Sequence, residues 1–179
     1  KLLDFIDKNK NKKLIAIQGL GFVGSAMSLV CANAINGDYA VIGVDQPTDE
    51  GLSIVSSFNN GVFPFIAEDP KINELFKKTI KKNNFIATTN DNAFKYVDII
   101  IIDVNLDVQK NNNNNGSLEY FNVDLSLFKE AIKTIGNKCK KNVLILVETT
   151  VPPGTCKKVV KPIILDLLKK RGITTSKVK

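Results

Sequence analysis

The chain has 179 residues, of which 44% are hydrophobic and 24% are charged, a balance typical of one well-packed globular domain. Its apolar runs are all far shorter than the roughly 20 residues that cross a bilayer, and Lys1–Lys13 is too charged for a secretory signal, so we expect a cytoplasmic protein with no membrane partner. The formal net charge of +7 comes from lysine-rich stretches in which no aromatic residues alternate with the basic ones. We therefore expect solvated lysines and no nucleic-acid partner.

The first half of the chain alternates short apolar runs with helical patterns. After a leading segment, residues 1–13, that contains the start of a short helix, strands are predicted at Leu14–Ile17, Tyr39–Val44 and Phe85–Thr88. Helices are predicted at Phe22–Ile35, around Gly51–Asn59 and from Asp69 or Pro70 to about Lys82. Proline suits the first turn of the last helix, whose apolar face is expected to carry Ile72, Leu75, Phe76 and Ile80.

The second half continues the alternation. A short helix is predicted at Asp91–Tyr96, and the isoleucine run inside Asp98–Val104 predicts a strand that is buried on both faces. The elements expected after it are a helix at Asp124–Asn137, another buried strand at Val143–Val147, and a helix at Thr155–Arg171 that Pro162 should kink. The asparagine tract Asn111–Asn115 predicts a flexible surface loop, or alternatively a cover over a bound cofactor.

Alternating strands and helices with buried strands predict an α/β fold, a Rossmann-like doubly wound parallel sheet with helices on both faces. We expect a single domain over residues 14–171, followed by a basic tail at residues 172–179. Because the chain has no initiator methionine and ends in a Lys/Thr-rich tail, we also expect it to be a fragment or a processed form of a longer protein.

The most informative motif joins the first predicted strand to the first predicted helix. It reads Gly19-Leu20-Gly21-Phe22-Val23-Gly24. In a Gly-x-Gly-x-x-Gly turn the first glycine permits the tight turn, the second lets a pyrophosphate approach the backbone, and the third lets the helix pack closely on the strand. The free N–H groups and the positive end of that helix then face the phosphates.

Asp45 ends the second predicted strand, 21 residues after Gly24. A carboxylate at this place accepts hydrogen bonds from the hydroxyls of an adenosine ribose, and it repels a 2′-phosphate. The two features together predict binding of NAD rather than NADP. The alternative is a plain strand–helix turn without a ligand.

A second motif, Glu148-Thr149-Thr150-Val151-Pro152-Pro153-Gly154-Thr155, follows a predicted strand. Ligands of open α/β sheets bind beyond the carboxyl ends of the strands, so its carboxylate and hydroxyls are candidates for the same site. The alternative is a purely structural role, in which Pro-Pro-Gly only forms a turn in a loop and Thr155 only caps the next helix.

Together these motifs resemble the nucleotide-sugar 6-dehydrogenase family, which includes UDP-glucose, GDP-mannose and UDP-N-acetylhexosamine dehydrogenases. The family reads Gly-x-Gly-[Tyr/Phe]-Val-Gly and near Glu-Ser-Thr-Val-Pro-Pro-Gly-Thr at the two sites. The segment from Asn60-Gly61 through Pro64 to Glu68 and the segment Phe85–Asn90 also resemble the family pattern. The resemblance implies an NAD-dependent enzyme that oxidises the C6 alcohol of a nucleotide sugar to a uronic acid with two NAD molecules, for polysaccharide precursors.

The resemblance also implies roles for individual residues. Gly19, Gly21, Phe22, Val23 and Gly24 would hold the pyrophosphate, and Asp45 the adenosine ribose. Thr149 would contact NAD, Thr150 would lie beside the catalytic water near the nicotinamide, and Glu148 would have a structural or water-ordering role. Val104 and Asn105 are further NAD contacts, although Val104-Asn105-Leu106-Asp107 departs from the family's Val-x-Thr-Pro, and Glu50 replaces a basic residue near the ribose acid.

In members of the family, the catalytic cysteine and the contacts to the nucleotide-sugar substrate lie later in the sequence than the part that this chain resembles. Cys31, Cys139 and Cys156 match no catalytic position, and with no histidine and no Cys-x-x-Cys pair we expect no metal site. We therefore expect this chain to be inactive alone and the whole enzyme to be a homo-oligomer. Two alternatives are a non-catalytic NAD-binding module and another Rossmann oxidoreductase, such as a hydroxyacid dehydrogenase, although those usually use a histidine.

Overall fold

A computed structural model of the chain describes residues 1–106, 108–112, 115–116 and 118–174. The chain divides into two compact units. The first contains residues 1–103 and 138–148, and the second contains residues 104–137 and 149–179. None of the helices in these described ranges combines the length and apolarity that crossing a membrane requires.

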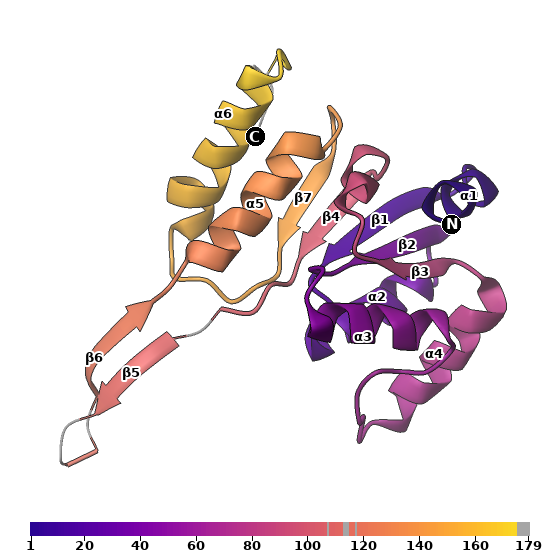
Figure 1. Ribbon diagram of the computed structural model, residues 1–179, viewed down its shortest axis with the longest axis horizontal. Helices are drawn as coiled ribbons and strands as arrows, with labels where there is room; N and C mark the ends of the chain where they lie inside the picture. The colour runs from indigo at the N-terminus through magenta and orange to yellow at the C-terminus, as the bar shows by residue number, and fades with distance from the viewer. Residues whose placement is uncertain (107, 113–114, 117, 175–179) are drawn as a thin grey trace. The chain divides into compact units, whose positions relative to one another are not determined.

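The first unit is built on a parallel sheet with the strand order β3-β2-β1-β4-β7 (Figure 1). The strands are β1 (Lys13–Gln18), β2 (Tyr39–Val44), β3 (Phe85–Thr88), β4 (Ile99–Ile102) and β7 (Leu144–Val147). Their register brings Gln18 beside Val44 on one side and beside Ile102 on the other. The carboxyl ends of these strands therefore meet at one edge, as the predicted Rossmann-like sheet requires.

Three helices cover one face of this sheet (Figure 1): α2 (Phe22–Ala32), α3 (Asp49–Asn59) and α4 (Pro70–Lys82). Leu29 of α2, Phe58 of α3 and Phe76 of α4 share one buried cluster with Ala87 of β3. Two short helices, α1 (Leu2–Lys8) and the 3₁₀ helix η1 (Asp91–Lys95), complete the helices of this unit, and η1 packs against β2.

Local sequence sets the ends of α4. The Asp69 side chain accepts a hydrogen bond from the Lys71 N–H, and Asn83 ends the helix in a left-handed conformation (φ 50°). The predicted apolar face is wrong at one position, because Ile80 is exposed and Thr79 is buried. The Thr79 hydroxyl meets the Asn33 amide at 2.7 Å and donates to the Leu75 carbonyl at 2.9 Å, so a satisfied polar residue replaces the apolar one.

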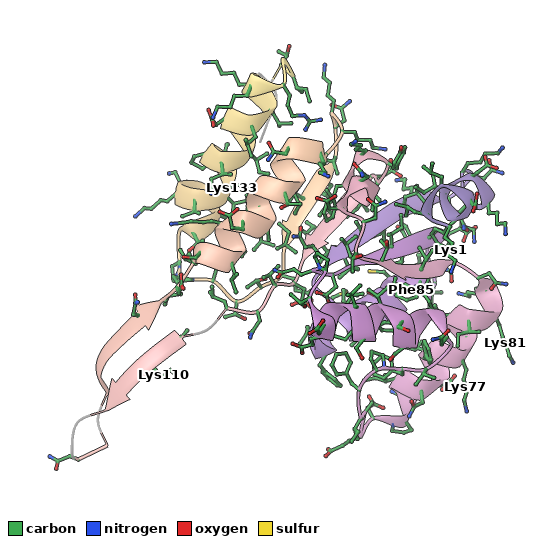
Figure 2. The ribbon with its side chains drawn as sticks, in the orientation of Figure 1. Lys1, Lys77, Lys81, Phe85, Lys110 and Lys133 are labelled. Carbon is green, nitrogen blue, oxygen red and sulfur yellow. The ribbon has the colours of Figure 1, made fainter. Side chains whose placement is uncertain are left out.

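Two lysines of α4, Lys77 and Lys81, lie on its outer side, as solvated lysines should (Figure 2). Figure 2 shows Lys77 and Lys81 pointing away from the sheet, whereas Phe85 lies between the sheet and its covering helices. The ring of Phe85 meets that of Phe58 with centroids 5.0 Å apart.

The outer strand β3 is covered by a side chain of α3. Asn59 donates from its amide nitrogen to the Ala87 carbonyl at 2.9 Å and accepts from the Ala87 N–H at 3.2 Å. One side chain thereby satisfies both backbone groups of one residue at the edge of the sheet.

The strand expected at Val143–Val147 is present as β7, but the expectation that it is buried is wrong. β7 is the other outer strand, and its alternate residues Leu144 and Leu146 are 52% and 43% exposed. A continuous apolar run does not distinguish a central strand from an outer one, which lacks a neighbour on one side.

The second unit contains a hairpin of β5 (Val108–Asn112) and β6 (Leu118–Val123) (Figure 1). The expected loop at Asn111–Asn115 is therefore wrong for Asn111 and Asn112, which belong to β5, while residues 113 and 114 lie outside the described residues. The polar composition of this segment predicted a loop, but strands pair through their backbone groups, and this pairing does not require apolar side chains.

The second unit also contains three helical segments in its described residues. The helix α5 (Ser126–Lys138) is followed later by η2 (Cys156–Val160), a π-helical segment, and by α6 (Lys161–Lys170). The predicted single helix is thus divided just before Pro162, where proline cannot supply the N–H of a regular helical bond. Arg171 donates to the Gly136 carbonyl at 2.8 Å and ties the end of α6 to α5.

Candidate cofactor-binding site

The glycine turn between β1 and α2 has the predicted geometry. Gly19 adopts a positive φ of 94°, which favours glycine, and its N–H donates to the Val44 carbonyl at 2.9 Å. Gly21 is the residue before the first turn of α2 and provides no capping side chain. The first N–H groups of a helix have no partner within the helix, so this end of α2 is suited to a bound anion.

The other two glycines of the motif have different surroundings. A Cβ atom on Gly24 would lie 2.0 Å from the Gly19 carbonyl oxygen, so only glycine allows α2 to approach the turn this closely. A Cβ on Gly21 would meet nothing within 4 Å. The space before Gly21 is open, and the next two residues, Phe22 and Val23, are 46% and 56% exposed. The turn therefore fits a diphosphate that contacts backbone.

Asp45 lies directly beside this turn. One oxygen of its carboxylate accepts the Leu20 N–H at 3.0 Å, and the other accepts the Gln46 N–H at 2.7 Å. The carboxylate is therefore fixed between the end of β2 and the glycine turn. The sequence predicted a ribose acceptor here, but it gave no sign of the bond to Leu20, because that bond depends on how the two strand ends lie side by side.

Two further carboxyl groups, those of Asp103 and Glu148, follow β4 and β7. The Asp103 N–H donates to the Gln18 carbonyl at 2.8 Å, and the Glu148 N–H donates to the Ile102 carbonyl at 2.9 Å, so both residues extend the register of the sheet. A Cβ on Gly24 would lie 3.3 Å from Asp103 Oδ2. That oxygen is buried without a hydrogen-bond partner. The sequence analysis missed Asp103, although a charged residue directly after four isoleucines was the available signal.

Burial raises the pKa of the Asp103 carboxyl above its usual value. Burial, and secondly the charge of Asp103, raise the pKa of Glu148. Burial also raises the pKa of the Cys31 thiol, and the charge of Glu148 adds to this effect. Cys31 is therefore kept as a thiol, a poor nucleophile. Cys139 is buried and Cys156 is exposed.

Four of the predicted site residues belong to the second unit: Val104, Asn105, Thr149 and Thr150. The Thr149 hydroxyl accepts the Val104 N–H at 2.9 Å and donates to the Val104 carbonyl at 3.0 Å. Thr149 is buried, whereas Thr150 and Asn105 are exposed. The structure thus brings Thr149 and Val104 together, and Asp107 lies outside the described residues.

The Pro-Pro-Gly segment is closed by its own threonine. The Thr155 hydroxyl donates to the Pro152 carbonyl at 2.7 Å, and Gly154 has a positive φ of 86°. Thr155 makes no side-chain cap on the helix that follows, so the alternative role considered for it is wrong.

The described groups favour recognition of a diphosphate with a neighbouring sugar. Backbone N–H groups and a helix end are suited to an anion, and the Asp45 carboxylate is a fixed acceptor beside them. Within the described ranges, no group of three or more His, Cys, Asp or Glu residues is arranged to hold a metal ion.

Curated relatives with a similar sequence are nucleotide-sugar dehydrogenases. GDP-mannose 6-dehydrogenase of Pseudomonas syringae pv. syringae is 32% identical over 162 residues, which are 89% of this chain and 33% of that protein. UDP-glucose 6-dehydrogenase TuaD of Bacillus subtilis is 31% identical over 147 residues, 81% of this chain and 28% of that protein. The chain spans about a third of the length of these relatives.

Solved structures agree with this result. NDP-N-acetyl-D-galactosaminuronic acid dehydrogenase from Methanosarcina mazei has a TM-score of 0.74 at 23% identity, over 98% of this chain and 35% of that chain, and shows the fold. GDP-mannose dehydrogenase from Pseudomonas aeruginosa has a TM-score of 0.65 at 25% identity, over 86% of this chain and 32% of that chain.

The family assignment rests on most of the chain. Residues 13–178 match the NAD binding domain of the UDP-glucose/GDP-mannose dehydrogenase family. The glycine turn and the fixed Asp45 carboxylate are what an NAD-binding domain requires. The chain therefore belongs to the UDP-glucose/GDP-mannose dehydrogenase family as its NAD-binding domain.

Proposed function

We propose that this chain supplies the NAD-binding part of a nucleotide-sugar 6-dehydrogenase that oxidises the C6 alcohol of its sugar to a carboxylate with two NAD molecules. The observation that carries the proposal is the glycine turn at Gly19–Gly24 with the Asp45 carboxylate bonded to its Leu20 N–H. NAD supplies the hydride acceptor for the oxidation. In this proposal, the contacts to the nucleotide-sugar substrate and the catalytic cysteine are supplied by protein outside these 179 residues.

The phosphate-binding role falls to the start of α2. The backbone N–H groups of Phe22, Val23 and Gly24 are in its first turn, where they bind the diphosphate together with the positive end of the helix. Gly21 contributes by having no side chain, because the space that a Cβ would enter is open.

The ribose-binding role falls to Asp45. Each oxygen of its carboxylate already accepts one backbone N–H, and each oxygen of a carboxylate can accept a second donor. The ribose hydroxyls are donors, so both bind without displacing Leu20 or Gln46. A 2′-phosphate is an anion and would be repelled, which makes NAD the preferred cofactor.

The proposed roles of residues in the second unit start from the two hydrogen bonds between the Thr149 hydroxyl and the backbone of Val104. Because Thr149 holds both backbone groups of Val104, we assign it to positioning the segment of Val104 and Asn105 that contacts NAD. Thr150 is exposed, and its hydroxyl orders the catalytic water near the nicotinamide.

Isothermal titration of the purified chain tests the cofactor site. Asp45→Ala should weaken NAD binding at least tenfold, because it removes the ribose acceptor and releases Leu20; tenfold corresponds to about 1.4 kcal/mol. Asp45→Asn should reduce the preference for NAD over NADP, because it removes the charge that repels the 2′-phosphate. Asp49→Ala is the matched control, since Asp49 is an exposed acid in the first turn of α3.

Two results would contradict the proposal. One is the absence of binding heat with NAD at millimolar concentration, and the other is an unchanged affinity in Asp45→Ala. In a second arm, absorbance should show no NAD reduction when the 179-residue chain is mixed with UDP-glucose or GDP-mannose. Reduction in that assay would disprove the placement of the catalytic cysteine outside this chain.

A further inference from the structure

A short connection joins β2 to α3 and carries Asp45 at its start. It ends at Thr48, whose hydroxyl accepts the Gly51 N–H at 3.2 Å and whose carbonyl accepts the Leu52 N–H at 2.8 Å. The first turn of α3 is therefore fixed directly after the connection. As a result, the residue on the inner side of that turn, Gly51, is buried.

Gly51 leaves no room for a side chain. A Cβ at this position would lie 2.1 Å from the Gln46 carbonyl oxygen and 3.4 Å from Asp45 Oδ1. The nearer obstacle is backbone in a connection of a few residues, so it cannot turn aside as a flexible side chain would. Any larger residue must displace Gln46 or lift the first turn of α3.

Gln46 is bonded to the carboxylate that we assign to the ribose. Its N–H donates to Asp45 Oδ1 at 2.7 Å, while Asp45 Oδ2 accepts the Leu20 N–H of the glycine turn at 3.0 Å. Displacement of Gln46 therefore moves one of the two donors that orient Asp45. Three contacts in series connect α3 with the glycine turn: Gly51 to Gln46, Gln46 to Asp45, and Asp45 to Leu20.

We propose that Gly51 is a positioning residue for NAD: its missing side chain lets α3 hold Gln46 where it orients the Asp45 carboxylate toward the ribose and the glycine turn. The inference rests on the proposed role of Asp45. Gly51 itself lies against Gln46 and Asp45 rather than in the glycine turn, so its effect on binding is indirect.

The test is Gly51→Ala in the purified chain, measured by isothermal titration with NAD and with an NAD analogue that lacks the 2′-hydroxyl of the adenosine ribose. NAD affinity should fall at least fivefold, and the preference for NAD over the analogue should shrink towards one. Ser53→Ala is the matched control, because Ser53 is exposed on the same helix and should leave both values unchanged. Alanine favours a helix over glycine, so weaker binding would not reflect a weaker helix.

A double variant separates positioning from general damage. In the background of Asp45→Ala, Gly51→Ala should weaken NAD binding by less than twofold, because the group that it positions is absent. Equal effects in both backgrounds would overturn the inference, and so would a Gly51→Ala protein with unchanged NAD affinity and unchanged preference over the analogue.

A milder variant covers the case in which Gly51→Ala fails to fold. Thr48→Ala removes the hydroxyl that holds the Gly51 N–H and should weaken NAD binding about threefold, and Thr48→Ser should restore it. Unchanged affinity in Thr48→Ala would count against the inference. If the wild-type chain itself does not bind NAD, the proposed function fails; if only the Gly51 and Thr48 variants behave like wild type, the positioning role alone fails.

Discussion

Two regions at the carboxyl edge of the sheet, one beyond β1 and β2 and the other beyond β4 and β7, hold their acidic side chains differently. Beyond β2, both oxygens of Asp45 accept a backbone N–H. Beyond β4, Asp103 has an oxygen that is buried without a partner, and Glu148 beyond β7 adds a second negative charge.

The difference lies in how each carboxylate is oriented: two backbone N–H groups fix Asp45, whereas a buried oxygen of Asp103 has no such donor. Asp45 is held in one orientation before any cofactor arrives, which lowers the cost of ordering it on binding. Burial instead disfavours the charged forms of Asp103 and Glu148, and the charge of Asp103 adds to this effect at Glu148.

The largest expected effect comes from breaking the first of these regions at its tightest contact. Gly24→Ala places a Cβ 2.0 Å from the Gly19 carbonyl oxygen, so α2 must move away from the turn. We expect NAD affinity to fall at least a hundredfold in calorimetry and the free energy of unfolding to fall by about 1–3 kcal/mol in denaturant titration. Unchanged stability would contradict the close packing described here.

Gly21→Ala is the matched control for that experiment. Its Cβ meets no atom within 4 Å, so the free energy of unfolding should change by less than about 1 kcal/mol. NAD affinity should nevertheless fall, because the methyl group occupies the space before the turn. The pair of variants separates loss of packing from loss of binding.

A smaller effect is expected after β7, where Thr149 follows Glu148. Thr149→Val keeps the shape of the side chain but leaves both backbone groups of Val104 without the hydroxyl. The free energy of unfolding should fall by about 1–3 kcal/mol, as measured by denaturant titration. Thr149→Ser keeps the hydroxyl and should lose less than half as much; equal losses would mean that the methyl group matters more than the two bonds.

The smallest effect is a gain in stability from Asp103→Asn. The charged carboxyl lacks a partner for a buried oxygen, and its pKa is raised by burial. A raised pKa in the folded chain means that stability falls as the pH rises from the ordinary range of aspartate through the raised value. At pH 7 the variant should therefore be more stable by about 1 kcal/mol, a value reduced from that of a fully buried acceptor because Asp103 is only partly buried.

The pH dependence sharpens this prediction. The advantage of Asp103→Asn in thermal unfolding should shrink as the pH is lowered from 7 towards the usual range of aspartate, where the wild-type carboxyl becomes neutral. Asp49→Asn, at an exposed position, should show no such change. An advantage for Asp103→Asn that stays constant with pH would show that the charge of Asp103 is not its cause.

Much of the fold could be predicted from sequence because local signals coincided with it. The isoleucine run at Ile99–Ile102 is a strand because it is central and covered, and the glycine spacing fixes the turn before α2. The run at Leu144–Val147 has nearly the same composition but lies at an outer edge. Composition reports what a strand can bury and not which neighbours it has.

For the candidate site, the sequence indicated residues that the structure brings together but not the bonds among them. The motif indicated Gly24 and Asp45, yet the bond from Leu20 to Asp45 and the contact of Gly51 with Gln46 join residues whose distance is set by the whole sheet. Asp103 could have been singled out as a charged residue directly after four isoleucines, but its proximity to Gly24 could not be read from the sequence. The roles of the glycine turn, Asp45, Thr149 and Thr150 in binding NAD all stay predictions.

The two hydrogen bonds between the Asn59 side chain and Ala87 of β3 affect how separate molecules can associate through the sheet edge. An incoming strand would pair with the outward N–H and carbonyl of Ala87, and both are already used by the Asn59 amide. Exposed sheet edges that keep such groups open invite aggregation. The uncharged amide of Asn59 thus occupies the two backbone groups of Ala87 that a second molecule's strand would need at this position of the sheet edge.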